Sequence, residues 1–81
     1  MHELSIATEI LDAVQKEAQK RNARVATVGL RIGELSGVEQ DSLRFCFEVL
    51  VQGSDLEPLA LTIERTPGTE LDLAWLEVED P

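Results

Sequence analysis

Residues 24–34 read Arg-Val-Ala-Thr-Val-Gly-Leu-Arg-Ile-Gly-Glu, and apolar side chains recur at every second position. This period of two is typical of a β-strand that buries one face. The side chains expected to point inward are Ala26, Val28, Leu30 and Ile32. Those expected on the opposite face are Val25, Thr27, Gly29 and Arg31. The residues that follow, 33–37, read Gly-Glu-Leu-Ser-Gly and predict a turn that begins a loop.

Helical periodicity precedes this strand, over residues 4–20. The apolar stripe, which Ile6 and Ile10 widen, consists of Leu4, Ala7, Leu11, Val14 and Ala18. On the polar face, Asp12 and Lys16 have the spacing of a favourable ion pair. Asn22 is expected to end the helix, because asparagine tolerates the left-handed backbone conformation found there.

A second helix is predicted after the loop, beginning with Asp41 or Ser42 as its N-cap and running through Gln52. Gly53 is expected to stop it. Its apolar stripe consists of Leu43, Phe47, Leu50 and Val51.

Two further strands are predicted, over residues 59–65 and 70–79, joined by a tight turn at Thr66-Pro67-Gly68-Thr69. The alternation slips within the last strand, so we expect a β-bulge near Ala74 and Trp75.

The predicted fold class is α+β, with two helices packed on one face of a three-stranded mixed sheet, in the order α-β-α-β-β. We expect the last two strands to form an antiparallel hairpin. If the first two strands are parallel, the third can sit between them.

Composition narrows the classes of function. The 81 residues suffice for one small domain. Sixteen acidic against seven basic residues give a net charge of −9, which argues against nucleic acid or an anionic membrane as partner. One cysteine excludes an internal disulfide, and we expect a cytoplasmic protein because the N-terminus does not resemble a signal peptide.

The first three residues, Met1, His2 and Glu3, can form a chelate. A free amine at Met1, the deprotonated backbone nitrogen of His2 and the imidazole Nδ1 would enclose one metal ion in two fused rings. A nitrogen donor from the Glu3 backbone or an oxygen from its carboxylate would complete a square, which suits Ni(II) or Cu(II). The alternative is that His2 is only a solvated side chain at a helix terminus.

No catalytic constellation is evident. Gly33 is not followed by the lysine of a phosphate-binding loop. Cys46 is expected to be a buried structural thiol, and Glu34 and Glu39 polar loop residues. We therefore expect no enzymatic activity and no catalytic residues.

Three segments together resemble the HypA/HybF family of hydrogenase maturation proteins. They are the opening Met-His-Glu-Leu-Ser, residues 32–39 (Ile-Gly-Glu-Leu-Ser-Gly-Val-Glu) and residues 43–48 (Leu-Arg-Phe-Cys-Phe-Glu). Residues 71–79 are similar to the last strand of that family. The resemblance implies a nickel metallochaperone that binds Ni(II) at Met1, His2 and Glu3. It also implies delivery to [NiFe]-hydrogenase, and in some organisms support of urease, with the GTPase HypB and the hydrogenase large subunit as partners.

The sequence departs from the family in one respect. The family carries a zinc domain with two CxxC pairs between its last two strands, where this chain has only the turn at residues 66–69. We therefore expect residues 1–81 to be a single nickel-binding domain without zinc, from which the zinc domain was removed by engineering or natural loss. A second hypothesis is a metal-free module whose acidic helix faces dock on a basic maturation GTPase.

Overall fold

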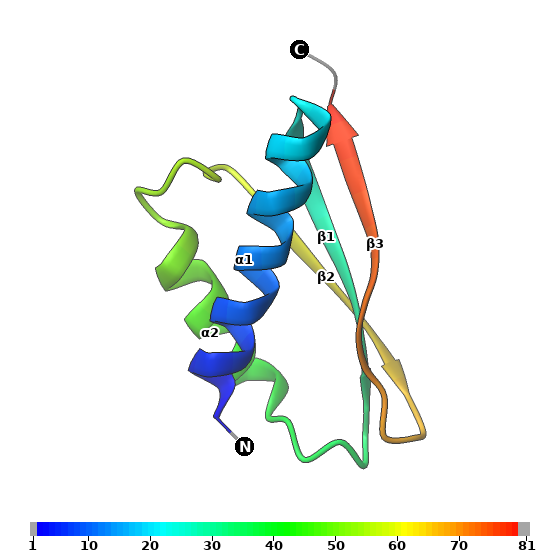
Figure 1. Cartoon of the computed structure of the whole chain (residues 1–81). Coiled ribbons are helices and arrows are strands. Elements are labelled where there is room, and N and C mark those ends of the chain that lie inside the picture. Colours follow the sequence, from blue (N-terminus) through cyan, green and yellow to red (C-terminus); the bar gives the residue numbers. More distant parts are fainter. Residues whose placement is uncertain (1, 80–81) are drawn as a thin grey trace.

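The computed structural model describes residues 2–79, which form two helices and three strands (Figure 1). In chain order these elements are α1 (Glu3–Arg21), β1 (Arg24–Gly33), α2 (Gln40–Val51), β2 (Ala60–Thr66) and β3 (Leu71–Glu79). Both helices lie on the same side of the sheet. The predicted fold class and element order are thereby confirmed.

The core lies between the helices and β1. Its fully buried side chains include Phe47, Leu30, Ile32 and Leu43. Helix α1 contributes Ala7, Leu11 and Val14, as the apolar periodicity predicts. Asn22 adopts the left-handed conformation (φ 50°, ψ 48°) and ends α1, which confirms that prediction.

The strand order is β2-β1-β3, with β1 parallel to β2 and antiparallel to β3. The condition stated above, that the first two strands are parallel, is met. The predicted hairpin of β2 with β3, and the placing of β3 between the other two strands, were both wrong. Strand β1 alone of the three carries fully buried residues, as expected for a strand in the central position of the sheet.

The chain passes from β2 to β3 over the end of β1, through residues 67–70. The backbone N–H groups of Gly33, Glu34 and Leu35 donate to carbonyls of Glu70, Thr66 and Gly68 at 2.7, 2.8 and 2.9 Å. A Cβ at Gly33 would lie 2.0 Å from the Gly68 carbonyl oxygen. This close approach explains why glycine stands at the end of β1.

Two bulges set which side chains of the β1/β3 pair face the helices. Gly29 pairs with Trp75 and Leu30 with Leu73, so Ala74 is the extra residue, and the predicted bulge is confirmed. A second irregularity lies at Ala26, between the pairs Val25/Val78 and Thr27/Glu77. It turns Val25 inward, to 2% exposed, and the expectation that Ala26 points inward and Val25 outward was wrong.

Helix α2 begins two or three residues earlier than expected, because Glu39 is its N-cap. The Glu39 carboxylate accepts hydrogen bonds from the backbone N–H groups of Asp41 at 2.8 Å and Ser42 at 3.1 Å. The predicted cap at Asp41 or Ser42 was therefore wrong. Leu50 also departs from the predicted buried stripe: it is 37% exposed and faces a hollow beside α1.

Candidate metal centre at the N-terminus

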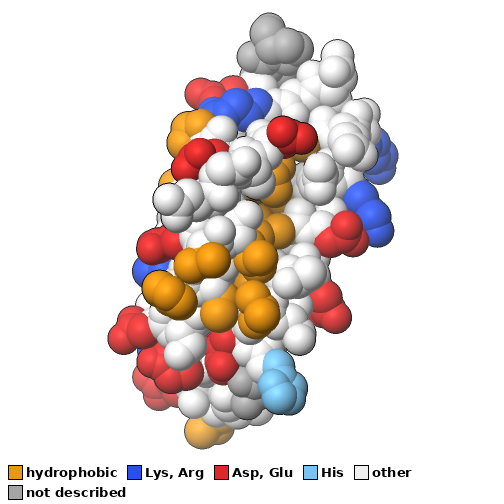
Figure 2. All heavy atoms as spheres, turned by 90° about the vertical axis from the view of Figure 1, so that its left-hand side faces the viewer, with side chains coloured by type: hydrophobic (Ala, Val, Ile, Leu, Met, Phe, Trp, Pro, Cys, Tyr) orange, Lys and Arg blue, Asp and Glu red, His pale blue; other side chains and the backbone are white. Residues whose placement is uncertain are grey.

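His2 stands exposed directly before α1, in an extended backbone conformation (φ −89°, ψ 91°). Its side chain does not cap the helix. In Figure 2, which looks onto the side of the two helices, the imidazole lies at the surface near the lower end of the molecule. The ring is therefore accessible to a ligand or metal ion. Met1, the other expected donor residue, lies outside the described residues.

The first backbone hydrogen bond of α1 runs from the N–H of Ile6 to the carbonyl of His2, at 3.1 Å. The N–H groups of residues before Ile6 lack an acceptor one turn earlier, as at any helix N-terminus. The nitrogens of His2 and Glu3 can therefore lose their protons without breaking a helical hydrogen bond.

Glu3 is half-buried and points toward the start of α2. Its carboxylate Oε2 accepts a hydrogen bond from the backbone N–H of Glu39 at 3.1 Å. The carboxylate of Glu39 in turn caps α2. Two consecutive acceptors thus join the N-termini of the helices, although 36 positions separate Glu3 from Glu39.

The electrostatics of this junction favour negative charge. The Glu39 N–H, followed by the N–H of Glu3 itself, holds the pKa of the Glu3 carboxyl below its ordinary value. The positive ends of both helix dipoles point the same way, toward these carboxylates. A bare cation would meet that field unfavourably, whereas an ion bound by deprotonated amides brings its own negative donors.

The sequence model of one protein family, described as "Hydrogenase/urease nickel incorporation, metallochaperone, hypA", matches residues 1–71. The match includes the expected metal-binding tripeptide and the whole Glu3 to Glu39 connection. The chain belongs to the HypA family.

Three curated relatives carry the name hydrogenase maturation factor HypA. The protein from Streptomyces avermitilis is 44% identical over 70 residues, which cover 84% of this chain and 53% of the relative. The protein from Geobacter metallireducens is 46% identical over 68 residues, covering 84% and 60%. The protein from Albidiferax ferrireducens is 40% identical over 78 residues, covering 95% and 69%. The chain thus spans between half and about two thirds of the length of these HypA proteins.

Two sequence-based expectations about other residues of this HypA chain need adjustment. Cys46 is half-buried and packs against the core, rather than being fully buried. Glu39 was expected to be a polar loop residue, whereas in the structure it is the N-cap of α2. Glutamate is not among the common N-cap residues, so the sequence offered no strong signal for this role.

Within residues 2–79, the structure brings no three side chains of the His, Cys, Asp or Glu type into one metal-binding group. A chelate at residues 1–3 does not need such a group, because most of its donors are main-chain nitrogens. Neither helix of the described chain combines the length and apolar character needed to cross a membrane.

Proposed function

We propose that this chain is the nickel-binding module of a HypA metallochaperone, which holds Ni(II) at Met1, His2 and Glu3 as cargo rather than as a catalytic cofactor. The observation that carries the proposal is the exposed His2 ahead of α1, where main-chain nitrogens are free of helical hydrogen bonds. The family match, with its description of nickel incorporation, supports the same conclusion.

The proposed donors are the Met1 amine, the backbone nitrogen and imidazole of His2, and one donor from Glu3. For this last donor, the backbone nitrogen fits better than the carboxylate. The carboxylate already accepts the Glu39 N–H. We infer that the side chain of Glu3 anchors the terminus on α2 while its main chain completes the square around Ni(II).

Release follows from the same chemistry. Protons compete with the metal for the amine and the amides, so binding liberates protons and weakens as the pH falls. A partner that supplies stronger or more numerous ligands can displace the four donors, beginning from the side of the site that faces solvent. Because three of the four donors belong to the first two residues, no rearrangement of the core is needed for transfer.

The family resemblance supports a place for this module in the cytoplasm. The proposed partners are the GTPase HypB and the [NiFe]-hydrogenase large subunit, and urease is a second proposed client. We propose that residues 1–81 act as a single nickel domain without zinc. Residues 66–70 close over the end of β1 with three main-chain hydrogen bonds, which supports the idea that β2 and β3 can be joined without an inserted domain.

Isothermal titration of Ni(II) into the untagged protein tests this proposal, with a visible spectrum recorded alongside. We expect one ion per chain and the weak bands of square-planar nickel. His2→Ala should reduce the affinity at least about 100-fold while circular dichroism remains unchanged, since loss of a residue that only hydrogen-bonds a metal ligand can already cost about 10- to 100-fold. Equal affinity in this variant would refute the assignment.

A second candidate function is that of a metal-free docking module for a maturation GTPase. The observation that favours it is the apolar surface of α2, where Phe45 is 67% and Val49 52% exposed, in a molecule of net charge −9. Figure 2 shows hydrophobic side chains gathered on this side of the molecule, flanked by acidic ones. In this case the affinity for the GTPase should fall with salt and remain the same in His2→Ala. A loss of GTPase binding in His2→Ala would instead favour the nickel-dependent role.

A further inference from the structure

A groove runs along α1 from Thr8 to the C-terminal end of the helix at Asn22. Helices α1 and α2 meet near their N-termini and separate toward their C-termini (Figure 1), and the loop after α2 only partly fills the space between them. Two hollows, of about 760 and 470 Å³, occupy this space. They share Gln15, Asp55 and Leu56 as lining residues, so they form one continuous groove.

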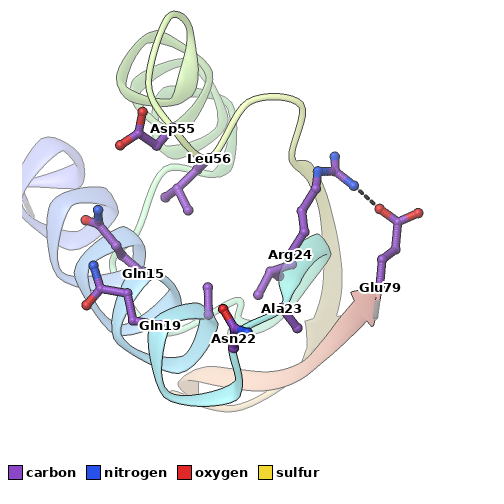
Figure 3. Close-up of a pocket in the computed structure, with 10 residues that line it drawn as sticks. Gln15, Gln19, Asn22, Ala23, Arg24, Asp55, Leu56 and Glu79 are labelled. Carbon is purple, nitrogen blue, oxygen red and sulfur yellow. Dashed lines mark hydrogen bonds and ion pairs between the residues drawn. The ribbon is translucent and has the colours of Figure 1, made fainter. Parts of the chain in front are cut away.

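One wall of the groove is a row of side-chain amides on α1. Gln15, Gln19 and Asn22 are spaced four and three residues apart, which places them on one face of the helix. Figure 3 shows them at the edge of the hollow, facing the loop that carries Asp55 and Leu56. Among the residues drawn there, only Arg24 and Glu79 are joined to each other. The amides therefore have donors and acceptors to offer.

The floor of the groove is apolar and its rim is acidic. Leu56 lies at the junction of the two hollows, and Leu11 and Leu50 continue the floor between the helices. The lining holds three acidic side chains, Asp12, Asp55 and Glu79, against one basic side chain, Arg24. Asp12 pairs with Lys16 and Glu79 with Arg24, whereas no ion pair in the described chain involves Asp55.

We propose that this groove binds an extended basic segment of a partner protein. Amides arranged along a line match the N–H and C=O groups of an extended backbone, because each can both donate and accept. The leucine floor would receive the apolar side chains of such a segment, and Asp55 a lysine or arginine. The net charge of −9 would steer a basic segment toward the protein.

The shape of the groove favours a peptide over a small molecule. Both hollows are open to solvent along the surface, whereas small-molecule sites enclose most of their ligand. The amide row is also separate from the proposed nickel centre, since Gln15 lies twelve residues, or about 18 Å, along α1 from Glu3. A chain that fails to bind nickel should therefore still bind a peptide in the groove.

The test is an NMR titration of the ¹⁵N-labelled chain with the peptide acetyl-Lys-Leu-Lys-Val-Lys-Leu-amide, paralleled by fluorescence anisotropy of its labelled form. We expect shifts confined to the residues that line the groove and their neighbours, which are residues 8–25, 50–57 and 79. Asp55→Lys should weaken binding about tenfold, in the range that loss of a charged contact causes. Gln15→Ala should weaken it about threefold, as expected for one lost neutral hydrogen bond.

The matched control is Glu64→Lys, which makes the same change of charge at an exposed position of β2. Equal weakening in Asp55→Lys and Glu64→Lys would show attraction to the overall charge and overturn the proposal. Shifts centred on Phe45 and Val49 would overturn it too. The proposal would also be overturned if the groove residues shifted with protein concentration in the absence of peptide and sedimentation showed a dimer. The occupant of the groove would then be a second copy of the chain. His2→Ala should bind the peptide as the unchanged chain does.

Discussion

The carboxylate of Glu3 accepts the backbone N–H of Glu39 at 3.1 Å, and so fixes the first turn of α1 against the first turn of α2. This hydrogen bond connects the proposed nickel ligands to the folded core. It gives the Glu3 side chain a structural role next to the proposed nickel site, and for this reason we propose its backbone nitrogen as the fourth donor.

Glu3→Ala separates the two possible roles of this residue. If the side chain only anchors the terminus, the variant should unfold at a lower temperature but still bind one Ni(II) ion, with an affinity within about threefold of the unchanged chain. Calorimetry measures the unfolding temperature, and nickel titration measures the affinity and the number of bound ions. Glu9→Ala, on the exposed face of α1, is the control. Loss of the bound ion in Glu3→Ala alone would identify the carboxylate as a ligand.

The lowered pKa of Glu3 predicts how stability depends on pH. Because the folded state holds the ionised form, the contribution is complete above the ordinary pKa of 4.5 and is lost as the pH falls through the lower folded value. The difference in melting temperature between the unchanged chain and Glu3→Ala should therefore be constant near neutral pH and shrink in acid. A difference that grows in acid would contradict this sign.

The cap of α2 can be tested by comparing two neighbouring carboxylates. Glu39→Ala removes the acceptor of two backbone N–H groups and should cost about 1 kcal/mol of unfolding free energy. Asp41→Ala, in the first turn, should cost clearly less, since it loses only a favourable interaction with the helix dipole. Urea denaturation of both variants gives the comparison. A larger loss of unfolding free energy in Asp41→Ala than in Glu39→Ala would show that Asp41 is the N-cap, as expected from the sequence.

The crossing of residues 67–70 over β1 makes Gly33 a steric requirement. Gly33→Ala places a Cβ against the backbone of Gly68 and should destabilise the fold by about 2 kcal/mol or more. Gly37→Ala is the matched comparison. Gly37 has a positive φ of 81° but open space around it, so about 1 kcal/mol is expected from backbone strain alone. Equal losses in the two variants would show that the contact between Gly33 and Gly68 is relaxed easily.

The features that the sequence predicted correctly depend on local signals. Asn22 ends α1 because its own side chain favours the left-handed conformation, and the bulge at Ala74 appears as a break in alternation. The bulge at Ala26 gave no such break, since Val25 and Ala26 are both apolar. The strand order could not be read locally either, because it depends on which edge of β1 the chain reaches after residues 67–70.

The candidate site likewise combines a feature that the local sequence predicts with one that only the folded structure shows. The chelating pattern of Met1, His2 and Glu3 is contiguous and can be read directly from the sequence. The hydrogen bond from Glu39 to Glu3 joins residues 36 positions apart, so only the packed structure reveals it. The amide row of the groove likewise becomes a candidate surface only once α1 and α2 are seen to diverge.

The central claim is that the N-terminal amine and His2 bind Ni(II), and blocking the amine tests it most directly. Acetylation of the Met1 amine converts it into an amide and introduces no new amine that could chelate the ion together with His2, while α1 and the core stay as they are. Nickel titration of the acetylated and free chains, with the N-terminus of each verified by mass spectrometry, should show binding in the free chain and at least about 100-fold weaker binding in the acetylated one. Equal affinity and an identical visible spectrum would contradict the claim and place the nickel ligands elsewhere in the chain.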